Sequence, residues 1–74
     1  MMAQLNNRQA DLLRTVARGQ EEGDACGDSD MVYLEEANLE IVRSLMFLSC
    51  IRIGPRRQLI LTIIGGEYYR ELFR

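Results

Sequence analysis

The sequence contains no lysine, no histidine and no tryptophan, and its one proline is Pro55. Histidine is the commonest catalytic base and a frequent metal ligand, so its absence excludes Ser-His-Asp triads, zinc-hydrolase sites and histidine-based acid–base chemistry. Gly65 and Gly66 lack the spacing of a phosphate-cradling loop. A chain of 74 residues also leaves little room for a cleft. We therefore expect a protein that is not an enzyme and needs no cofactor.

Long apolar runs and a cysteine framework are also missing. The longest uncharged run, Gln58–Gly66, has nine residues, whereas a membrane span needs about 20. Met1–Asn7 lacks the basic and apolar regions of a signal peptide. Cys26 and Cys50 form neither a disulfide framework nor a C-x-x-C motif. We expect a soluble cytoplasmic protein without membrane contact, with Cys50 as a small core residue and Cys26 as an exposed loop thiol.

The charged residues that are present are unevenly distributed. All nine basic residues are arginine, and the net charge of the chain is −2. Positions 1–40 hold three arginines and nine acids, which gives −6, whereas positions 41–74 hold six arginines and two acids, which gives +4. Positions 21–40 carry eight acids and no base. This polarity bears on the partner, because a surface of one sign attracts ligands of the other.

Hydrophobic periodicity predicts a first helix near the N-terminus. Asn6 and Gln9 have the spacing of a capping box at its start, and Gly19 occupies a position typical of a helix C-terminus. Positions 20–30, which follow, contain two glycines and five acids but no large apolar side chain, and they predict an acidic loop. The apolar stripe of the helix consists of Leu5, Leu12, Leu13 and Val16.

Positions 31–48 predict two short helices. They contain more apolar residues than one helical face can bury. Two helices that meet near Ala37–Asn38 bury these residues better, with Ser29 or Asp30 capping the first and Asn38 capping the second.

A β-hairpin and a final helix complete the expected fold. Cys50–Ile53 and Gln58–Leu61 alternate as strands on either side of the turn at 54–57. Thr62 can cap a last helix, Ile63–Phe73, in which Gly65 and Gly66 indicate close packing against a neighbouring element. Its expected inward stripe is Ile64, Tyr68 and Leu72.

The expected order of elements is helix-helix-helix-hairpin-helix, in one domain over positions 1–74. This order resembles a winged helix-turn-helix domain. The returning strand closes with Leu61-Thr62-x-x-Gly65-x-x-Tyr68 at the start of the final helix, as in many such domains. The resemblance covers positions 31–74, with the first helix placed before it. It implies a mainly α-helical fold with a small β-hairpin as the wing.

The resemblance also implies a function, a DNA-binding regulator of transcription that acts as a dimer. In this fold the third helix usually enters the major groove and basic wing residues contact phosphate or the minor groove. The wing residues that this implies are Arg52, Arg56 and Arg57. The residues that it places toward the major groove are Asn38, Arg43 and Ser44.

The acidic segment supports an alternative function, a protein-binding adaptor or inhibitor of the kind encoded by phages or mobile elements. Acidic side chains can dock a basic protein partner or occupy a nucleic-acid site. The candidate docking residues are Glu35, Glu36, Glu40, Asp28 and Asp30. Carboxylates beside the arginine wing favour this alternative, because a helix that enters DNA must neutralise phosphates. Carboxylates turned away from the wing favour DNA binding.

Two further expectations concern metals and self-association. Asp24, Asp28 and Asp30 are closely spaced but do not match the ligand positions of a calcium-binding EF-hand, so no metal site is expected. Tyr69 and Phe73 lie at the side of the final helix, where an exposed aromatic residue often marks an oligomer contact. They are the predicted contact residues of a homodimer.

Overall fold

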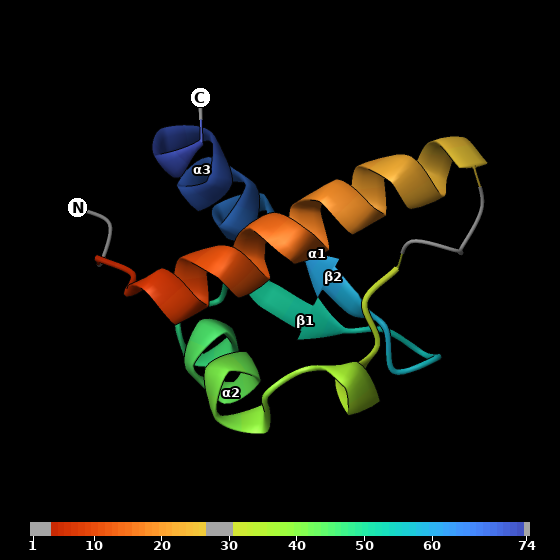
Figure 1. Cartoon of the computed structure of the whole chain (residues 1–74), viewed down its shortest axis with the longest axis horizontal. Helices are drawn as coiled ribbons and strands as arrows, with labels where there is room; N and C mark the ends of the chain where they lie inside the picture. The colour runs from red at the N-terminus through yellow and green to blue at the C-terminus, as the bar shows by residue number, and fades with distance from the viewer. Residues whose placement is uncertain (1–3, 27–30, 74) are drawn as a thin grey trace.

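The computed structural model describes residues 4–26 and 31–73, with the backbone alone for positions 21–26. Within these residues it is mainly helical and contains a two-stranded antiparallel hairpin, as predicted (Figure 1). The elements are α1 (Asn7–Cys26), the 3₁₀ turn η1 (Leu34–Glu36), α2 (Leu39–Phe47), β1 (Ile51–Ile53), β2 (Leu59–Leu61) and α3 (Ile63–Leu72).

The start of α1 is confirmed and its predicted end is wrong. The Gln9 amide donates to Asn6 Oδ1 at 2.8 Å, and the Asn6 amide donates to Gln9 Oε1 at 3.0 Å, which completes the capping box. The helix continues past Gly19 because Gly19 is buried and the Gln20 side chain is held by the fold. Gln20 Oε1 accepts a hydrogen bond from the Leu61 amide of β2 at 2.8 Å.

The longer α1 removes most of the predicted acidic loop. Positions 20–26 are helical, and Cys26 ends the helix instead of lying in a loop. The predicted cap at Ser29 or Asp30 lies outside the described residues, as does Asp28.

Before α2, the predicted cap at Asn38 is confirmed and the predicted helix is wrong. Asn38 caps α2, because its Oδ1 accepts from the Glu40 amide at 2.9 Å and the Ile41 amide at 3.3 Å. The helix expected before it is only the single turn η1. The residues that precede η1 are extended and pair with the outer edge of β2, with Tyr33 opposite Gln58. β-Branched and aromatic residues such as Val32 and Tyr33 suit this pairing, which satisfies the backbone groups of the strand edge.

The hairpin has the predicted strands. Ile51 pairs with Leu61 and Ile53 with Leu59. The Arg57 amide donates to the Gly54 carbonyl at 3.0 Å, and Arg57 itself is left-handed with φ of 63°. This is the position where a three-residue hairpin loop usually has glycine.

The core lies where α1 packs against α2, β2 and α3, and Figure 1 shows α2 and α3 on opposite sides of α1. Cys50 is fully buried as predicted, and burial raises the pKa of its thiol, which keeps it protonated at neutral pH. The predicted inward stripe of α3 is confirmed only at Tyr68, because Ile64 and Leu72 are exposed. The buried apolar residues are Leu13, Val16, Ala17, Val42, Leu45, Cys50, Ile51, Leu59 and Tyr68.

Thr62 and Gly65 join α3 to the hairpin. Thr62 Oγ1 accepts from the Gly65 amide at 2.9 Å and donates to the Ser49 carbonyl, so the predicted cap is confirmed. A Cβ atom at Gly65 would overlap the Cys50 carbonyl oxygen. The expected close approach at this glycine is therefore present, and it brings the first turn of α3 against the backbone that precedes β1.

α2 is followed, after its C-cap Leu48, by a left-handed residue, Ser49, with φ of 62°. The Ser49 amide donates to the Met46 carbonyl at 2.9 Å, and the Cys50 amide donates to the Leu45 carbonyl at 2.9 Å. These two bonds make a Schellman motif, whose left-handed position favours glycine. Ser49 occupies it with the steric cost of a Cβ atom.

Replacing Ser49 with glycine is expected to stabilise the fold by about 0.5–1 kcal/mol, because relief of the left-handed strain exceeds the added entropy of the unfolded chain. The measurement is urea unfolding followed by circular dichroism. Ser49→Ala is the control, since alanine keeps the Cβ atom and gains nothing. An unchanged or lower midpoint for Ser49→Gly would contradict the assignment of strain to this residue.

Candidate binding surfaces

The outward side of α2 exposes three large apolar side chains to solvent. We define the α2 face as Leu39, Glu40, Arg43, Met46 and Phe47, all of which are exposed. Phe47 is 88% exposed, Leu39 50% and Met46 40%. The opposite side of the helix is buried through Val42 and Leu45, which fixes the orientation of the α2 face toward solvent. A monomeric protein gains nothing from a phenylalanine in water, so such a patch is typical of an interaction surface.

The exposed α2 face was not predicted from the sequence. Two helices were expected to bury the apolar residues of positions 31–48, but the first of them is only the turn η1, which is too short to cover α2. The signal was present in the sequence, since the number of apolar residues exceeds what one helical side can bury. The apolar residues of α2 that remain exposed are Leu39 at its start and Met46 and Phe47 at its end.

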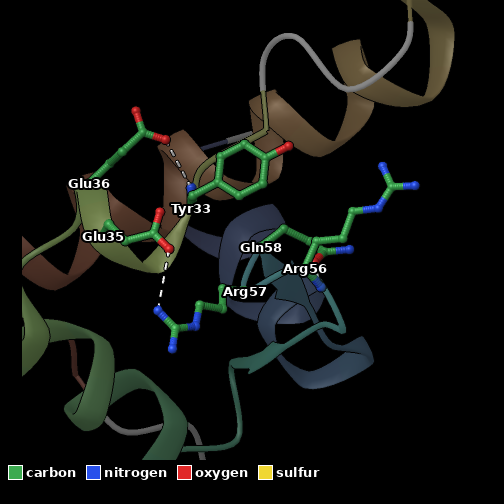
Figure 2. Close-up of polar contacts among 6 residues, drawn as sticks. All are labelled: Tyr33, Glu35, Glu36, Arg56, Arg57 and Gln58. Atoms are coloured by element: carbon green, nitrogen blue, oxygen red, sulfur yellow. Dashed lines mark hydrogen bonds and ion pairs between the residues drawn. The ribbon is translucent and has the colours of Figure 1, made fainter.

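The predicted wing residues gather on the hairpin. Arg52 lies on β1, Arg56 and Arg57 lie on the turn, and all three are exposed. Figure 2 shows Arg57 directed toward η1, whereas Arg56 extends away on the other side of the turn. Gln58 supports the turn, because its Oε1 accepts from the Arg56 amide at 2.8 Å.

Carboxylates lie beside this hairpin. Glu35 Oε1 is 3.7 Å from Arg57 Nη1, and both side chains are well exposed (Figure 2). Glu36 Oε1 accepts from the Tyr33 amide at 3.2 Å, which holds η1. Glu40 lies on the α2 face, three residues from Arg43. One of the three wing arginines, Arg57, is therefore accompanied by an acid of η1, which reduces its attraction for phosphate.

The residues predicted to face the major groove do not act together. Asn38 is exposed, but its carboxamide oxygen holds the start of α2. Ser44 is half-buried between α1 and α2, where it accepts from Gln9 Nε2 at 2.9 Å and donates to the Ile41 carbonyl at 2.7 Å. Of these three predicted side chains, Arg43 is the one that the α2 face presents to solvent.

The predicted dimer residues contact each other and α1. The rings of Tyr69 and Phe73 have centroids 5.5 Å apart. The guanidinium of Arg14 lies 5.4 Å from the centroid of the Phe73 ring, a cation–π distance. Both rings are half-buried. They attach the end of α3 to α1.

The described residues contain neither a candidate metal site nor a candidate membrane-spanning helix. Across the side chains that the structure describes, those of residues 4–20 and 31–73, no three acidic or cysteine groups lie together so that they could hold a metal ion. In that same part of the chain, every helix is too short or too polar to cross a bilayer. Comparisons with known protein families, curated proteins and solved structures find no match for this chain.

Proposed function

We propose that this chain is a small non-enzymatic binding module with a winged-helix-like arrangement, and that it inserts the α2 face into an apolar groove of a partner protein. The observation that carries the proposal is the 88% exposure of Phe47 next to Met46 on the same helix. Burying a phenylalanine side chain contributes about 1.5–3 kcal/mol. A partner groove that covers Phe47 recovers this free energy.

The winged-helix part of the proposal is supported by the order of elements. An extended segment at positions 32–33 pairs beside β2, α2 precedes the hairpin, and α3 follows it. The Leu61-Thr62-x-x-Gly65-x-x-Tyr68 motif, on which the resemblance depends, has a structural role at Thr62, Gly65 and Tyr68. Thr62 caps α3, Gly65 approaches the Cys50 backbone, and Tyr68 is buried.

The α2 face matches the helix-in-groove mode of recognition. Leu39 and Met46 are spaced as i and i+7, two of the anchor positions of a helix laid into an apolar groove, and Phe47 lies next to Met46. Glu40 and Arg43 supply one charge of each sign beside the apolar anchors. The acids of η1 border the same region and suit a partner with a basic rim, in keeping with the docking role proposed for Glu35, Glu36 and Glu40.

The test replaces Phe47 with serine and compares it with Leu72→Ser, a change at a 48% exposed apolar residue on α3. A photo-crosslinking amino acid at position 47 first identifies the partner in cells, and calorimetry then measures binding with the purified partner. We expect Phe47→Ser to weaken binding at least about tenfold, as for an aromatic anchor. Leu72→Ser should leave the affinity unchanged.

Both variants should melt like the wild type, because neither side chain is buried. The proposal fails if the two substitutions weaken binding equally, or if position 47 crosslinks to nucleic acid and not to protein. A binding heat capacity change near zero would also contradict it, because burial of apolar surface makes this change negative.

DNA binding through the hairpin is the second candidate. The observation that favours it is the exposure of three arginines, Arg52, Arg56 and Arg57, on one short hairpin. The test is retardation of mixed duplex fragments at about 50 mM salt, where phosphate contacts are strong. Retardation that Arg52→Gln/Arg56→Gln abolishes would replace the protein-binding proposal. No retardation at tens of micromolar protein would exclude this candidate.

A further inference from the structure

Gly66 has no role in the fold, unlike its neighbour Gly65. A Cβ atom at Gly65 would overlap the Cys50 carbonyl oxygen, whereas a Cβ atom at Gly66 would meet nothing closer than Leu61 Cδ2, at 3.9 Å. The backbone at Gly66 is helical and right-handed, so no special dihedral angle requires glycine there. Glycine inside a helix is also less favourable than alanine. The packing of the described residues therefore gives no reason for a glycine at position 66.

The surface around Gly66 has an apolar projection and a hollow. Ile63, one turn earlier, is 84% exposed. Beside it lies a shallow depression of about 400 Å³. Its lining residues are Leu61, Ile63, Gly66, Tyr69 and Arg70.

The same side of α3 carries one charge of each sign. Glu67 and Arg70 are exposed, and they are spaced with Ile63 as i, i+4 and i+7, so the three side chains share one stripe. Among the described residues, neither Glu67 nor Arg70 forms an ion pair. We call Ile63, Gly66, Glu67 and Arg70 the α3 stripe.

We infer that the α3 stripe is the contact through which two copies of this chain associate, with their α3 helices antiparallel about a twofold axis. A twofold contact must be self-complementary, and the α3 stripe combines a protruding isoleucine with a depression and an acid with a base. Antiparallel pairing about an axis between Glu67 and Tyr68 brings Ile63 of each copy to the Tyr69 and Arg70 edge of the other copy's depression. The same register brings Glu67 of each copy within reach of Arg70 of the other. The missing side chain of Gly66 lets the two helices approach closely.

This surface shares only Tyr69 with the one predicted from the terminal aromatics, because Tyr69 lines the depression whereas Phe73 packs against Tyr69 and Arg14 within the chain. It also lies on a different helix from the α2 face, so the two surfaces can fail independently. α3 has ten residues and is about 15 Å long. A standard interface covers about 800 Å² per partner, roughly 15% of the 5210 Å² surface of this chain. One short helix covers less, so we expect micromolar association.

The first test is sedimentation of Gly66→Ala and the wild type at about 5–500 µM, a range that spans the expected dissociation constant. The added methyl group should weaken dimerisation at least tenfold by separating the helices. It should also raise the melting temperature of the monomer by about 4 °C, because alanine favours the helix. A residue that served only the fold would not move these two quantities in opposite directions.

The second test exchanges the charges. Glu67→Arg and Arg70→Glu should each be monomeric at concentrations where the wild type is dimeric, because each places like charges together. An equimolar mixture of the two single variants should form a heterodimer, and the double variant Glu67→Arg/Arg70→Glu should again form a homodimer. A wild type that stays monomeric at about 500 µM, or a Gly66→Ala variant that still dimerises fully, overturns the inference.

Discussion

Replacing Gly65 with alanine is expected to unfold this chain at room temperature. The new Cβ atom would overlap the Cys50 carbonyl oxygen and lie 2.9 Å from Leu61 Cδ1. Backbone atoms at this point cannot move aside freely, because the same Cys50 carbonyl accepts the Thr62 amide at 3.1 Å. Overpacking of this kind costs about 3 kcal/mol, which is close to the whole stability of a domain this small.

The measurement for Gly65→Ala is thermal and urea unfolding followed by circular dichroism. Gly66→Ala is a matched control one residue away, with the same chemical change and open space around the new atom. We expect the control to melt above the wild type and Gly65→Ala to show no cooperative transition. If Gly65→Ala melted within a few degrees of the wild type, α3 would not pack against the Cys50 backbone as described.

Replacing Leu13 with alanine is expected to have a similarly large effect. Leu13 is fully buried and lies on the helix that packs against α2, β2 and α3. A buried leucine-to-alanine change costs about 2–5 kcal/mol through lost burial and the cavity that remains. In a chain of 74 residues this loss leaves a large unfolded fraction at 25 °C.

The control for Leu13→Ala is Leu39→Ala, the same change at a half-exposed residue of the α2 face. It is expected to shift the free energy of unfolding by less than about 1 kcal/mol. A denaturant series gives both values, and the slope of the Leu39→Ala curve should match the wild type. Equal losses for the two variants would mean that Leu13 is not at the centre of the core.

The helix starts could be predicted because they depend on hydrogen bonds within a few residues of sequence. Asn6, Asn38 and Thr62 each cap the helix that follows by accepting from a backbone amide two or three residues later. The hairpin was predictable for a similar reason, since Gly54 and Pro55 separate two short runs that alternate. Side-chain identity alone therefore decides these boundaries.

The features that escaped prediction depend on partners far along the chain. α1 runs past Gly19 because Gln20 bonds to Leu61, 41 residues later. Tyr33 is extended because the outer edge of β2 is available to it. The candidate site shows the same limit. Its arginines could be found from composition, but the pairing of Glu35 with Arg57 and the exposure of Phe47 follow from tertiary placement.

The position of α1 has a consequence for how the chain folds during its synthesis. α1 packs against β2 and α3, which are made after it, as well as against α2. An isolated helix relies on tertiary packing for most of its stability in water. α1 therefore gains its full set of packing partners only after β2 and α3 have left the ribosome. A chain that stops before Leu59 lacks Leu59 and Tyr68, two of the buried core residues that α1 and its partners enclose.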